Sequence, residues 1–440
     1  MNKNIESWAR QQFEELNLRD KRLNKRAQLI ACNMMKKPSA SINMQSENWS
    51  ESKGAYRFFD SEKVSFQELI KPHINLVKSK ANSLEIVLAI QDTCYISYGH
   101  HPSVTDLGHI GAEETSGVIL HNTLAVNPSS KYPSVIGVLD QWIHNRKNTK
   151  DEEWKETELW KEASSRIKLD ITKTKVVEVM DREGGVFDII KHCLSLKHEF
   201  LIRTKSNRYV KNPFRHQIIE AASKVIAAGN IEIDVQKKKG QKKRKAKLEV
   251  KYLPIEIPGS HGRKDESIYC NLVQVVEINP PKNQEPLSWY LLTSVEVNDL
   301  EDALKVIEWY RYRWIIEEYH KCIKTGCKVE SKQLKSSFRI ENYLGIAGII
   351  AVKLLQIRDL MRINPNELAS LVVDPLSLKI IQNYHKMDKE LTIKEFQILV
   401  AKMGGFLNRK SDGNPGWQTL WKGQLQLFWM VEGAKTILGV

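Results

Sequence analysis

The run Ile86-Val-Leu-Ala-Ile90, followed by Gln91 and Asp92, is the stretch from which the fold can be worked out. Five consecutive apolar residues are typical of a strand that is covered on both faces. Apolar runs at 95–98, 117–125 and 134–139 continue from it and predict a meander. The pattern then changes to a polar helix at 152–167, a strand at 176–180, a helix at 187–196 and a strand at 200–203.

This order of three strands, helix, strand, helix and strand is that of a ribonuclease-H-like α/β core. Residues 205–288 interrupt it. They contain runs at 231–235, 248–252 and 272–276 and show little helical period after about 228, so we expect a mostly β insertion there. A basic run at 237–247 falls on a turn of the insertion, where it stays mobile until it meets an anion. The core resumes with a strand at 289–293 and one long helix at 300–325.

Two helical regions flank this core. Residues 1–65 are basic, and Arg26 belongs to a set of cations at helical spacing, while Arg57 lies in the aromatic segment Gly54-Ala-Tyr-Arg-Phe-Phe59. Such a module suits contact with a DNA backbone, although a solvated surface helix fits the charge equally well. Residues 361–440 also have a helical pattern. We therefore expect three regions, at 1–65, 66–360 and 361–440.

The net charge of the 440-residue chain is +14, which favours a polyanion such as nucleic acid as partner, or else serves solubility. We find neither a membrane-spanning run of about 20 apolar residues nor an export signal, so we expect no membrane partner. The six cysteines lack zinc spacing and are expected to be reduced thiols. Cys322 and Cys327 could form a weak metal pair, but packing is the better interpretation.

Two carboxylates follow strands of the predicted core. Asp92 comes one residue after the end of the first strand, and Asp181 directly follows the strand at 176–180. Side chains at the carboxyl ends of strands line the ligand crevice of an α/β sheet, so the two can share a site. Aspartates in such positions also cap turns and helices.

The helix predicted at 300–325 carries a polar stripe. Its members are separated by three, four, four and three residues, and they are Tyr310, Arg313, Glu317, Lys321 and Lys324. A stripe with this spacing is normally apolar and faces the core. A solvated face with pairs between opposite charges is the alternative.

Phosphoryl transfer explains why three carboxylates would gather. Attack on a phosphodiester is assisted by two divalent ions that stabilise the attacking and leaving oxygens. Mg²⁺ binds through carboxylates, water and phosphate oxygens, and Mn²⁺ accepts similar ligands. Asp92, Asp181 and Glu317 are therefore the predicted metal ligands and catalytic residues, with Mg²⁺ as cofactor and Mn²⁺ as substitute.

With these residues the chain resembles the DDE transposases of the insertion-sequence-four group, most closely those of the transposon-five type. The signature of that group is Tyr, two residues, Arg, three residues, Glu, six residues and Lys. Tyr310, Arg313, Glu317 and Lys324 fill it. The similarity continues at Gly54-Ala-Tyr-Arg57, Ile90-Gln-Asp-Thr93, Asp181-Arg-Glu183, Ile278-Asn-Pro-Pro-Lys282, Trp289, Leu354-Leu-Gln-Ile-Arg358 and Gly404-Gly-Phe406.

The resemblance implies a DNA-binding module at 1–65, a ribonuclease-H-like core at 66–360 with its β insertion at 205–288, and a dimerisation region at 361–440. It implies that Trp289, helped by Trp314, stacks at a base flipped near the transposon end, and that Tyr310, Arg313 and Lys324 hold the adjacent phosphate. Without the resemblance, core packing is the better interpretation of Trp289. The resemblance assigns end DNA to Arg203 and Lys321, and the N-terminal module to Arg26 and Arg57.

The activity implied is cut-and-paste transposition: binding of terminal repeats as a dimer, cleavage through a hairpin, and joining of the 3′ ends to target DNA. The expected location is the bacterial cytoplasm, at the nucleoid. A DNA-binding regulator that does not cut is the alternative, and the intact triad favours the enzyme. Gly184-Gly185 and Cys94 depart from the family pattern, and none of them belongs to the triad. The N-terminus argues against a shortened inhibitor form.

Overall fold

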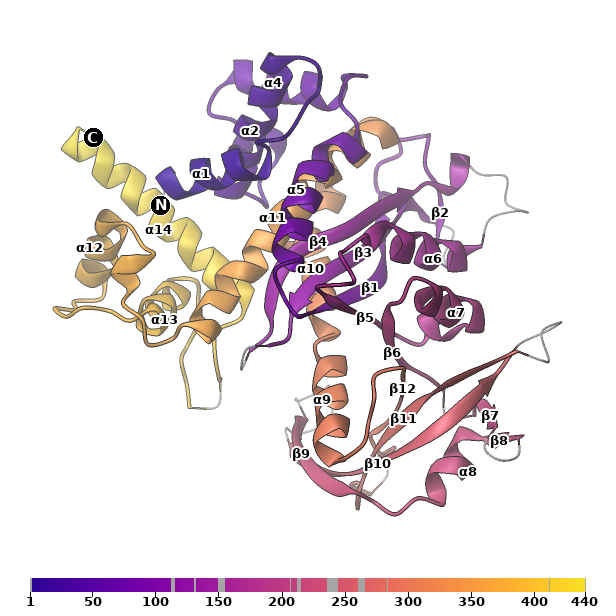
Figure 1. Cartoon of the computed structure of the whole chain (residues 1–440). Coiled ribbons are helices and arrows are strands. Elements are labelled where there is room, and N and C mark those ends of the chain that lie inside the picture. Colours follow the sequence, from indigo (N-terminus) through magenta and orange to yellow (C-terminus); the bar gives the residue numbers. More distant parts are fainter. Residues whose placement is uncertain are drawn as a thin grey trace. The chain divides into compact units, whose positions relative to one another are not determined.

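The computed structural model describes residues 2–111, 115–129, 132–148, 155–205, 207–211, 215–235, 244–259, 266–282, 284–410 and 412–439. Over these residues it is a mixed α/β structure whose strands join in one sheet, in the order β2-β3-β1-β5-β6-β12-β11-β10-β7-β8, with β4 beside β3 and β9 beside β10 (Figure 1). This confirms the prediction of an α/β fold.

The chain divides into two compact units. One unit consists of Met1–Ala81, Thr93–Glu153 and Glu317–Val440, and the other of Asn82–Asp92 and Trp154–Ile316. The boundaries fall inside continuous elements, because β1 (Ile86–Ser97) and α10 (Trp314–Lys321) each contribute residues to both units.

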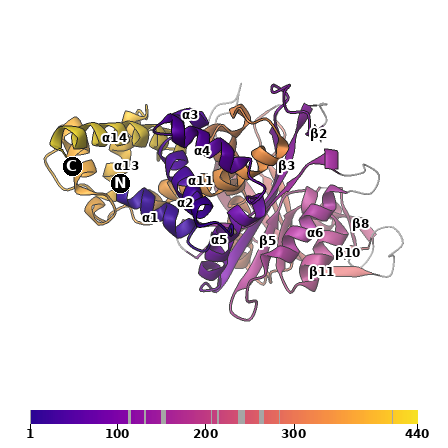
Figure 2. The same cartoon turned by 90° about the horizontal axis from the view of Figure 1, so that it is seen from above.

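The first unit begins with five helices, α1 (Asn2–Gln12), α2 (Lys21–Lys36), α3 (Ile42–Gln45), α4 (Trp49–Phe59) and α5 (Phe66–Ala81). Helix α2 starts where the side chain of Asp20 accepts a hydrogen bond from the backbone N–H of Arg22. Strand β3 (Thr115–Asn127) pairs in antiparallel fashion with β2 (Gly108–Ile110) and with β4 (Ser134–His144). Helices α5 and α11 (Ser337–Ile363) pack on β4 and on each other (Figure 2).

The C-terminal part of this unit is helical, with α12 (Pro375–Tyr384), α13 (Ile393–Met403) and α14 (Trp417–Leu438). Within α11, the segment Ser337–Leu360 is long and apolar enough to cross a membrane by length and composition, but 78% of its apolar window is buried inside the structure. Burial of that kind is expected of a core helix of a soluble fold as well, so the segment is weak evidence for a membrane.

The second unit contains the parallel strands. Strand β1 pairs with β5 (Lys175–Met180) from Ile86 to Ile90, and β5 pairs with β6 (Glu199–Arg203). Helix α6 (Glu156–Ile167) precedes β5, and α7 (Phe187–Ser195) connects β5 to β6. Both helices share a buried core with β5 and β6. The strand expected at 95–98 is not separate, because β1 continues unbroken from Ile86 to Ser97.

The insertion extends the sheet through antiparallel strands. It contains β7 (Tyr209–Lys211), β8 (Arg215–Gln217), α8 (Ile218–Ser223), β9 (Gly229–Val235), β10 (Arg244–Pro258) and β11 (Ser267–Glu277), and β12 (Ser288–Thr293) returns the chain to β6. The first seven residues of the basic run, 237–243, lie outside the described residues, and the rest begin β10.

The prediction of a single helix at 300–325 is wrong. Helix α9 (Leu300–Arg311) ends before α10 begins, and a π-helical turn, Cys322–Gly326, follows α10. At the joint the backbone bonds tighten, since the N–H groups of Arg313 and Ile316 donate to the carbonyls three residues earlier. The polar stripe is therefore divided among a helix, a joint, a second helix and a π turn.

Candidate active site

Asp92 and Asp181 occupy equivalent places on paired strands. The last pair in the register of β1 and β5 is Ile90 with Val179, and each aspartate comes two residues after its member of that pair. Asp92 is inside β1 rather than beyond its end, which corrects the expected boundary. Because the two strands are parallel, both carboxylates lie at the same edge of this part of the sheet.

The loop after β5 concentrates negative charge. Asp181 accepts a hydrogen bond from the backbone N–H of Glu183 at 2.8 Å. Burial raises the pKa of Glu183, and the carboxylates of Asp181 and Glu156 raise it further. A carboxyl whose pKa is raised by neighbouring carboxylates is typical of a site that binds a cation.

Arg313 forms an ion pair with Asp92. Its Nη1 lies 3.2 Å from Oδ2 of Asp92, and the two side chains are 15% and 14% exposed. Arg313 is at the joint between α9 and α10, where the tightened backbone turns its side chain toward β1. A partly desolvated guanidinium beside the carboxylate stabilises its charged form.

Tyr310 packs among the same group. Burial raises the pKa of its hydroxyl, while the guanidiniums of Arg313 and Arg203 oppose the rise and Asp181 adds to it. Arg203, at the end of β6, donates from Nη2 to the carbonyl of Ser288 at 3.1 Å. Burial lowers the pKa of Arg203. The structure thus brings Asp92, Asp181, Arg203, Tyr310 and Arg313 together.

Trp289 borders this group from β12. The centroid of its ring lies 6.3 Å from that of Tyr310, with an angle of 57° between the planes. The side chain is half-buried rather than enclosed, so core packing explains only part of its position. Trp314, the first residue of α10, is 63% exposed. A partly open aromatic beside cations is the kind of surface on which a base can stack.

Glu317 follows Arg313 by one helical turn in α10. Possible ligand atoms of Asp92, Glu317 and His320 lie within 4.8 Å of one another, so these residues could hold a metal ion. Asp181 is not part of that group. Two carboxylates suit a hard divalent cation. The side chains of Asp92 and Glu317 are therefore suitable ligands for a divalent metal ion such as Mg²⁺.

Sequence reasoning missed His320, although it stands three residues after Glu317 on the same face of the helix. The side-chain amide of Asn122 donates to Nε2 of His320 at 3.0 Å. The contact holds the imidazole of His320 in place on α10, beside Glu317.

A buried polar network supports α10 beneath His320. Oδ1 of Asn122 accepts a hydrogen bond from Nε2 of Gln141 at 2.7 Å. Nε2 of Gln141 also donates to the hydroxyl of Tyr319 at 2.9 Å. These groups are all less than 10% exposed, and unsatisfied polar groups are costly when buried. The network therefore favours one rotation of α10, and with it one direction for Glu317.

The two distal cations of the stripe lie in different surroundings. Lys321 is exposed at the end of α10. Lys324 lies in the π turn, with Nζ 3.5 Å from Oε1 of Glu330. That oxygen also accepts from the backbone N–H of Ser97 at 3.0 Å, so Glu330 ties Lys324 to the end of β1.

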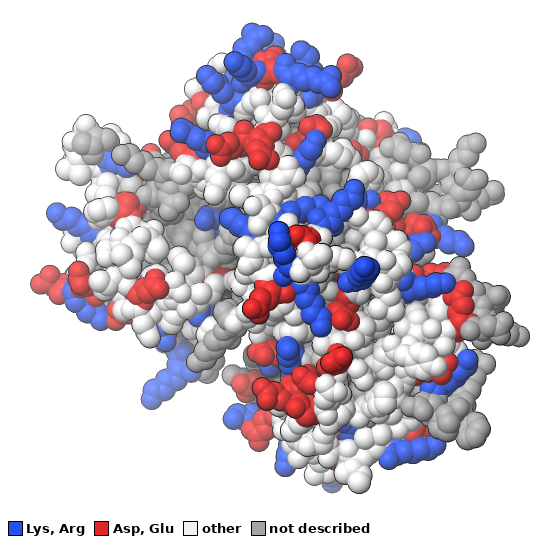
Figure 3. Space-filling model, viewed as in Figure 1, with Lys and Arg blue, Asp and Glu red and all other residues white. Residues whose placement is uncertain are grey.

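The two predicted N-terminal cations differ in exposure. Arg57 is exposed in the last turn of α4, whereas Arg26 is half-buried on α2. The guanidinium of Arg26 lies over Gly54 of α4, where a Cβ would stand 2.8 Å from its Nη1. Lys and Arg side chains gather over the tip of these helices in Figure 3.

Comparison with known protein families gives three matches. Residues 5–64 match a family described as transposase DNA-binding, and residues 349–438 match the transposase Tn5 dimerisation domain. Residues 121–352, more than half of the chain, match the transposase DDE domain. The third match includes Asp181 and Glu317, while Asp92 lies before its start.

These matches confirm the prediction of a DNA transposase. A DDE domain implies a ribonuclease-H-like core and a nuclease that uses a divalent metal, and the other two matches support DNA binding and the formation of homodimers. The chain therefore belongs to the family of transposases with a DDE domain.

Proposed function

We propose that the protein is a cut-and-paste transposase of the insertion-sequence-four group, closest to the transposon-five type. The observation that carries this is the equivalent position of Asp92 and Asp181 on paired parallel strands, next to a joint that presents Arg313 and then Glu317. Together with the DDE match, this supports an acidic triad rather than scattered capping residues.

In this proposal Asp92, Asp181 and Glu317 hold Mg²⁺, or Mn²⁺ in its place. The metal would stabilise the developing charge on the attacking and leaving oxygens of the phosphodiester. The protein's own groups do the positioning. The guanidinium of Arg313 has five donors, so it can hold Asp92 and still offer an N–H to a phosphate, with Tyr310 and Lys324 beside it.

Cleavage through a hairpin requires a sharply bent strand and an unstacked base at the transposon end. Trp289 would receive that base, assisted by Trp314, and Arg203 and Lys321 would contact the backbone of the end. Stacking on an aromatic ring recovers about 1–3 kcal/mol for each base. The half-buried state of Trp289 and the exposure of Trp314 support this role.

The DNA substrates are the terminal repeats and a target duplex, bound by a homodimer in a synaptic complex. In this proposal residues 1–65 grip the end through cations such as Arg26 and Arg57, and residues 361–440 form the dimer. Such a protein would act in the bacterial cytoplasm, at the nucleoid.

Cleavage of labelled end DNA in Mg²⁺ by single Ala variants of Asp92, Asp181 and Glu317 tests the proposal. All three should lose nicking and strand transfer while they still shift the DNA in a gel. Glu308→Ala is the matched control, because Glu308 is an exposed carboxylate on α9. If the wild-type chain binds the ends and cuts nothing, the alternative of a regulator that binds without cutting is correct.

A further inference from the structure

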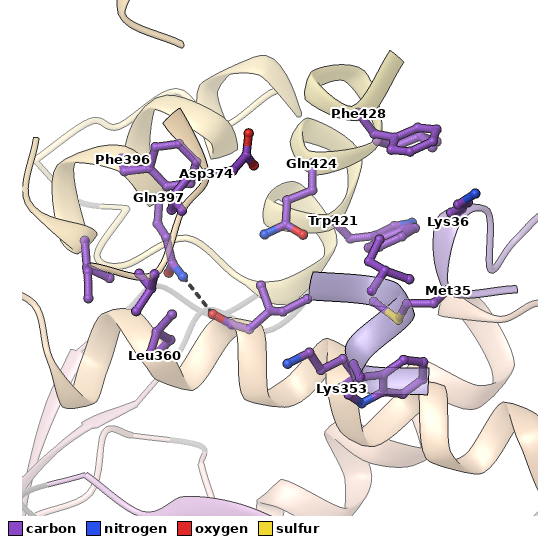
Figure 4. Close-up of a pocket in the computed structure, with 17 residues that line it drawn as sticks. Met35, Lys36, Lys353, Leu360, Asp374, Phe396, Gln397, Trp421, Gln424 and Phe428 are labelled. Carbon is purple, nitrogen blue, oxygen red and sulfur yellow. Dashed lines mark hydrogen bonds between the residues drawn. The ribbon is translucent and has the colours of Figure 1, made fainter. Parts of the chain in front are cut away.

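A cavity of about 150 Å³ lies between the N-terminal and C-terminal helices of the first unit (Figure 4). Its walls come from α1 and α2 on one side and from α11, α13 and α14 on the other. Apolar cavities of about this volume take up molecules the size of a benzene ring. The size therefore points to a small ligand rather than to a peptide.

The lining is largely aromatic and aliphatic. Trp8, Phe396 and Phe428 are each less than 10% exposed, and Trp421 points into the space from α14. Aromatic walls of this kind favour a flat ring, because rings gain from offset or edge-to-face contact in addition to burial. Met35 adds an adaptable thioether to the same wall.

Lys353 gives the cavity a positive charge. Its ammonium group extends from α11 among these apolar side chains and has no hydrogen-bond or ion-pair partner among the residues that the structure describes. Burial lowers the pKa of Lys353, and the nearby Lys80 lowers it further. A bound anion would remove this cost, since an opposite charge stabilises the charged form.

The other charged groups of the lining already have partners. Lys36 lies 3.5 Å from the carboxylate of Glu47. Asp374 caps α12 by accepting from the backbone N–H of Ser377 at 2.9 Å and from its hydroxyl at 2.7 Å. Among the charged side chains of the lining, Lys353 is therefore the one that we expect to pair with a ligand.

Gln397 supplies a second polar anchor. Its Nε2 donates to the carbonyl of Ile357 at 2.8 Å, which fixes the orientation of the amide. Its Oε1 is buried and accepts no hydrogen bond from any described residue, although the side chain is only 4% exposed. A buried unpaired carbonyl costs about 1–3 kcal/mol, so a donor on the ligand would be favoured here.

We propose that this cavity binds a small aromatic carboxylate that also carries a hydroxyl or ring N–H. The carboxylate would pair with Lys353, the ring would lie among Trp8, Trp421 and Phe428, and the donor would satisfy Oε1 of Gln397. Because Trp8 falls within the DNA-binding match and Lys353, Gln397 and Phe428 within the dimerisation match, the ligand would join these two regions.

Isothermal titration calorimetry of the full chain with 4-hydroxybenzoate tests this directly. We expect one site with a dissociation constant of about 1 mM or below. Phenol lacks the carboxylate and benzoate lacks the donor, so each should bind about tenfold more weakly or worse, as expected for a lost hydrogen bond to a charged or buried group. These comparisons need no variant.

Two variants assign the anchors. Lys353→Met should bind 4-hydroxybenzoate no more tightly than phenol. Gln397→Leu should bind 4-hydroxybenzoate no more tightly than benzoate. Both replace a polar side chain of the cavity lining with an apolar one of similar size, so they should remain folded. Lys402→Met, on the exposed side of α13, should change nothing. No saturable binding up to about 10 mM, or preferences that persist in both variants, would overturn the proposal.

Discussion

At the scale of single residues, Asp92 illustrates how the protein handles a carboxylate that is partly withdrawn from water. The guanidinium of Arg313 lies 3.2 Å from it and offsets part of the cost of burial. Arginine suits this place better than lysine, because its planar fork can bind a carboxylate and a phosphate at once. We therefore expect Arg313→Lys to be a poor replacement in DNA cleavage.

Trp289 offers a test that separates packing from base stacking. Since its side chain is half-buried, Trp289→Ala should destabilise the protein by less than the about 3–5 kcal/mol that a buried Trp costs. First-strand nicking should continue, while hairpin formation on pre-nicked ends falls. An abasic site at the flipped position should restore part of it, because the unstacking cost disappears. Tyr269→Ala, at an exposed aromatic of β11, is the control, and normal hairpin yield in folded Trp289→Ala would refute the role.

Asn122 tests whether the buried network positions α10. Replacing it with Ala removes the donor to Nε2 of His320 and the acceptor for Gln141. Loss of an outer-shell partner typically lowers activity by about 10–100-fold, so we expect cleavage to slow by that much while end binding is kept. The measurement is single-turnover cleavage at saturating DNA over a series of Mn²⁺ concentrations. Unchanged rate and metal dependence in a folded variant would show that the network is only structural.

At the scale of elements, the joint between α9 and α10 determines where the polar stripe points. Tyr310 is buried, Arg313 contacts Asp92 on β1, and Glu317 lies one turn further along, in α10. A straight α-helix would have kept all five residues in one line along its surface. The i→i−3 hydrogen bonds donated by Arg313 and Ile316 interrupt the regular α-helical pattern at this joint.

Much of the second unit could be predicted from the sequence because its signals are local. The apolar runs at 86–90 and 176–180 and the amphipathic segment at 187–196 were sufficient to place β1, β5 and α7. The joint at 312–313 was not predictable, because no Gly or Pro interrupts the helical pattern there. The continuation of β1 past Asp92 and the role of Asn122 depend on tertiary contacts, which a single sequence does not reveal.

Helix α11 carries a pH-dependent carboxyl group near its start. Burial and the nearby Asp106 raise the pKa of Glu341 to about 7, from about 4.5 in the unfolded chain. The folded state therefore holds a proton that the unfolded chain releases between these values. The stabilisation is complete below pH 4.5 and is lost as pH rises through 7.

Glu341→Gln should accordingly be more stable than wild type at pH 8, by on the order of 1–3 kcal/mol, and about equal to it near pH 4.5. Urea denaturation of both proteins at several pH values measures the difference. Glu367→Gln, at an exposed carboxyl, should show no such trend. A difference that does not depend on pH would contradict the assignment.

At the scale of the whole molecule, the net charge of +14 favours contact with the phosphates of DNA, and we expect these contacts to supply much of the affinity. Binding of end DNA should fall steeply with salt. Arg57→Ala should weaken binding and reduce the log–log slope by about 0.9, because one phosphate contact is lost. Arg26→Ala should weaken it as well. Lys224→Ala, at an exposed cation directly after α8, serves as the control. An unaltered slope in both arginine variants would count against the N-terminal module.

The central claim is that Asp92, Asp181 and Glu317 bind the catalytic metal, and exchange of a ligand atom tests it most directly. Asp181→Cys replaces a carboxylate oxygen with sulfur, which hard Mg²⁺ accepts poorly and Mn²⁺ accepts better. The measurement is cleavage of end DNA by this variant in each metal, with Glu183→Cys as the neighbouring control. The account predicts no cleavage in Mg²⁺ and partial recovery in Mn²⁺ for Asp181→Cys alone. Cleavage at the wild-type rate in Mg²⁺ would contradict it.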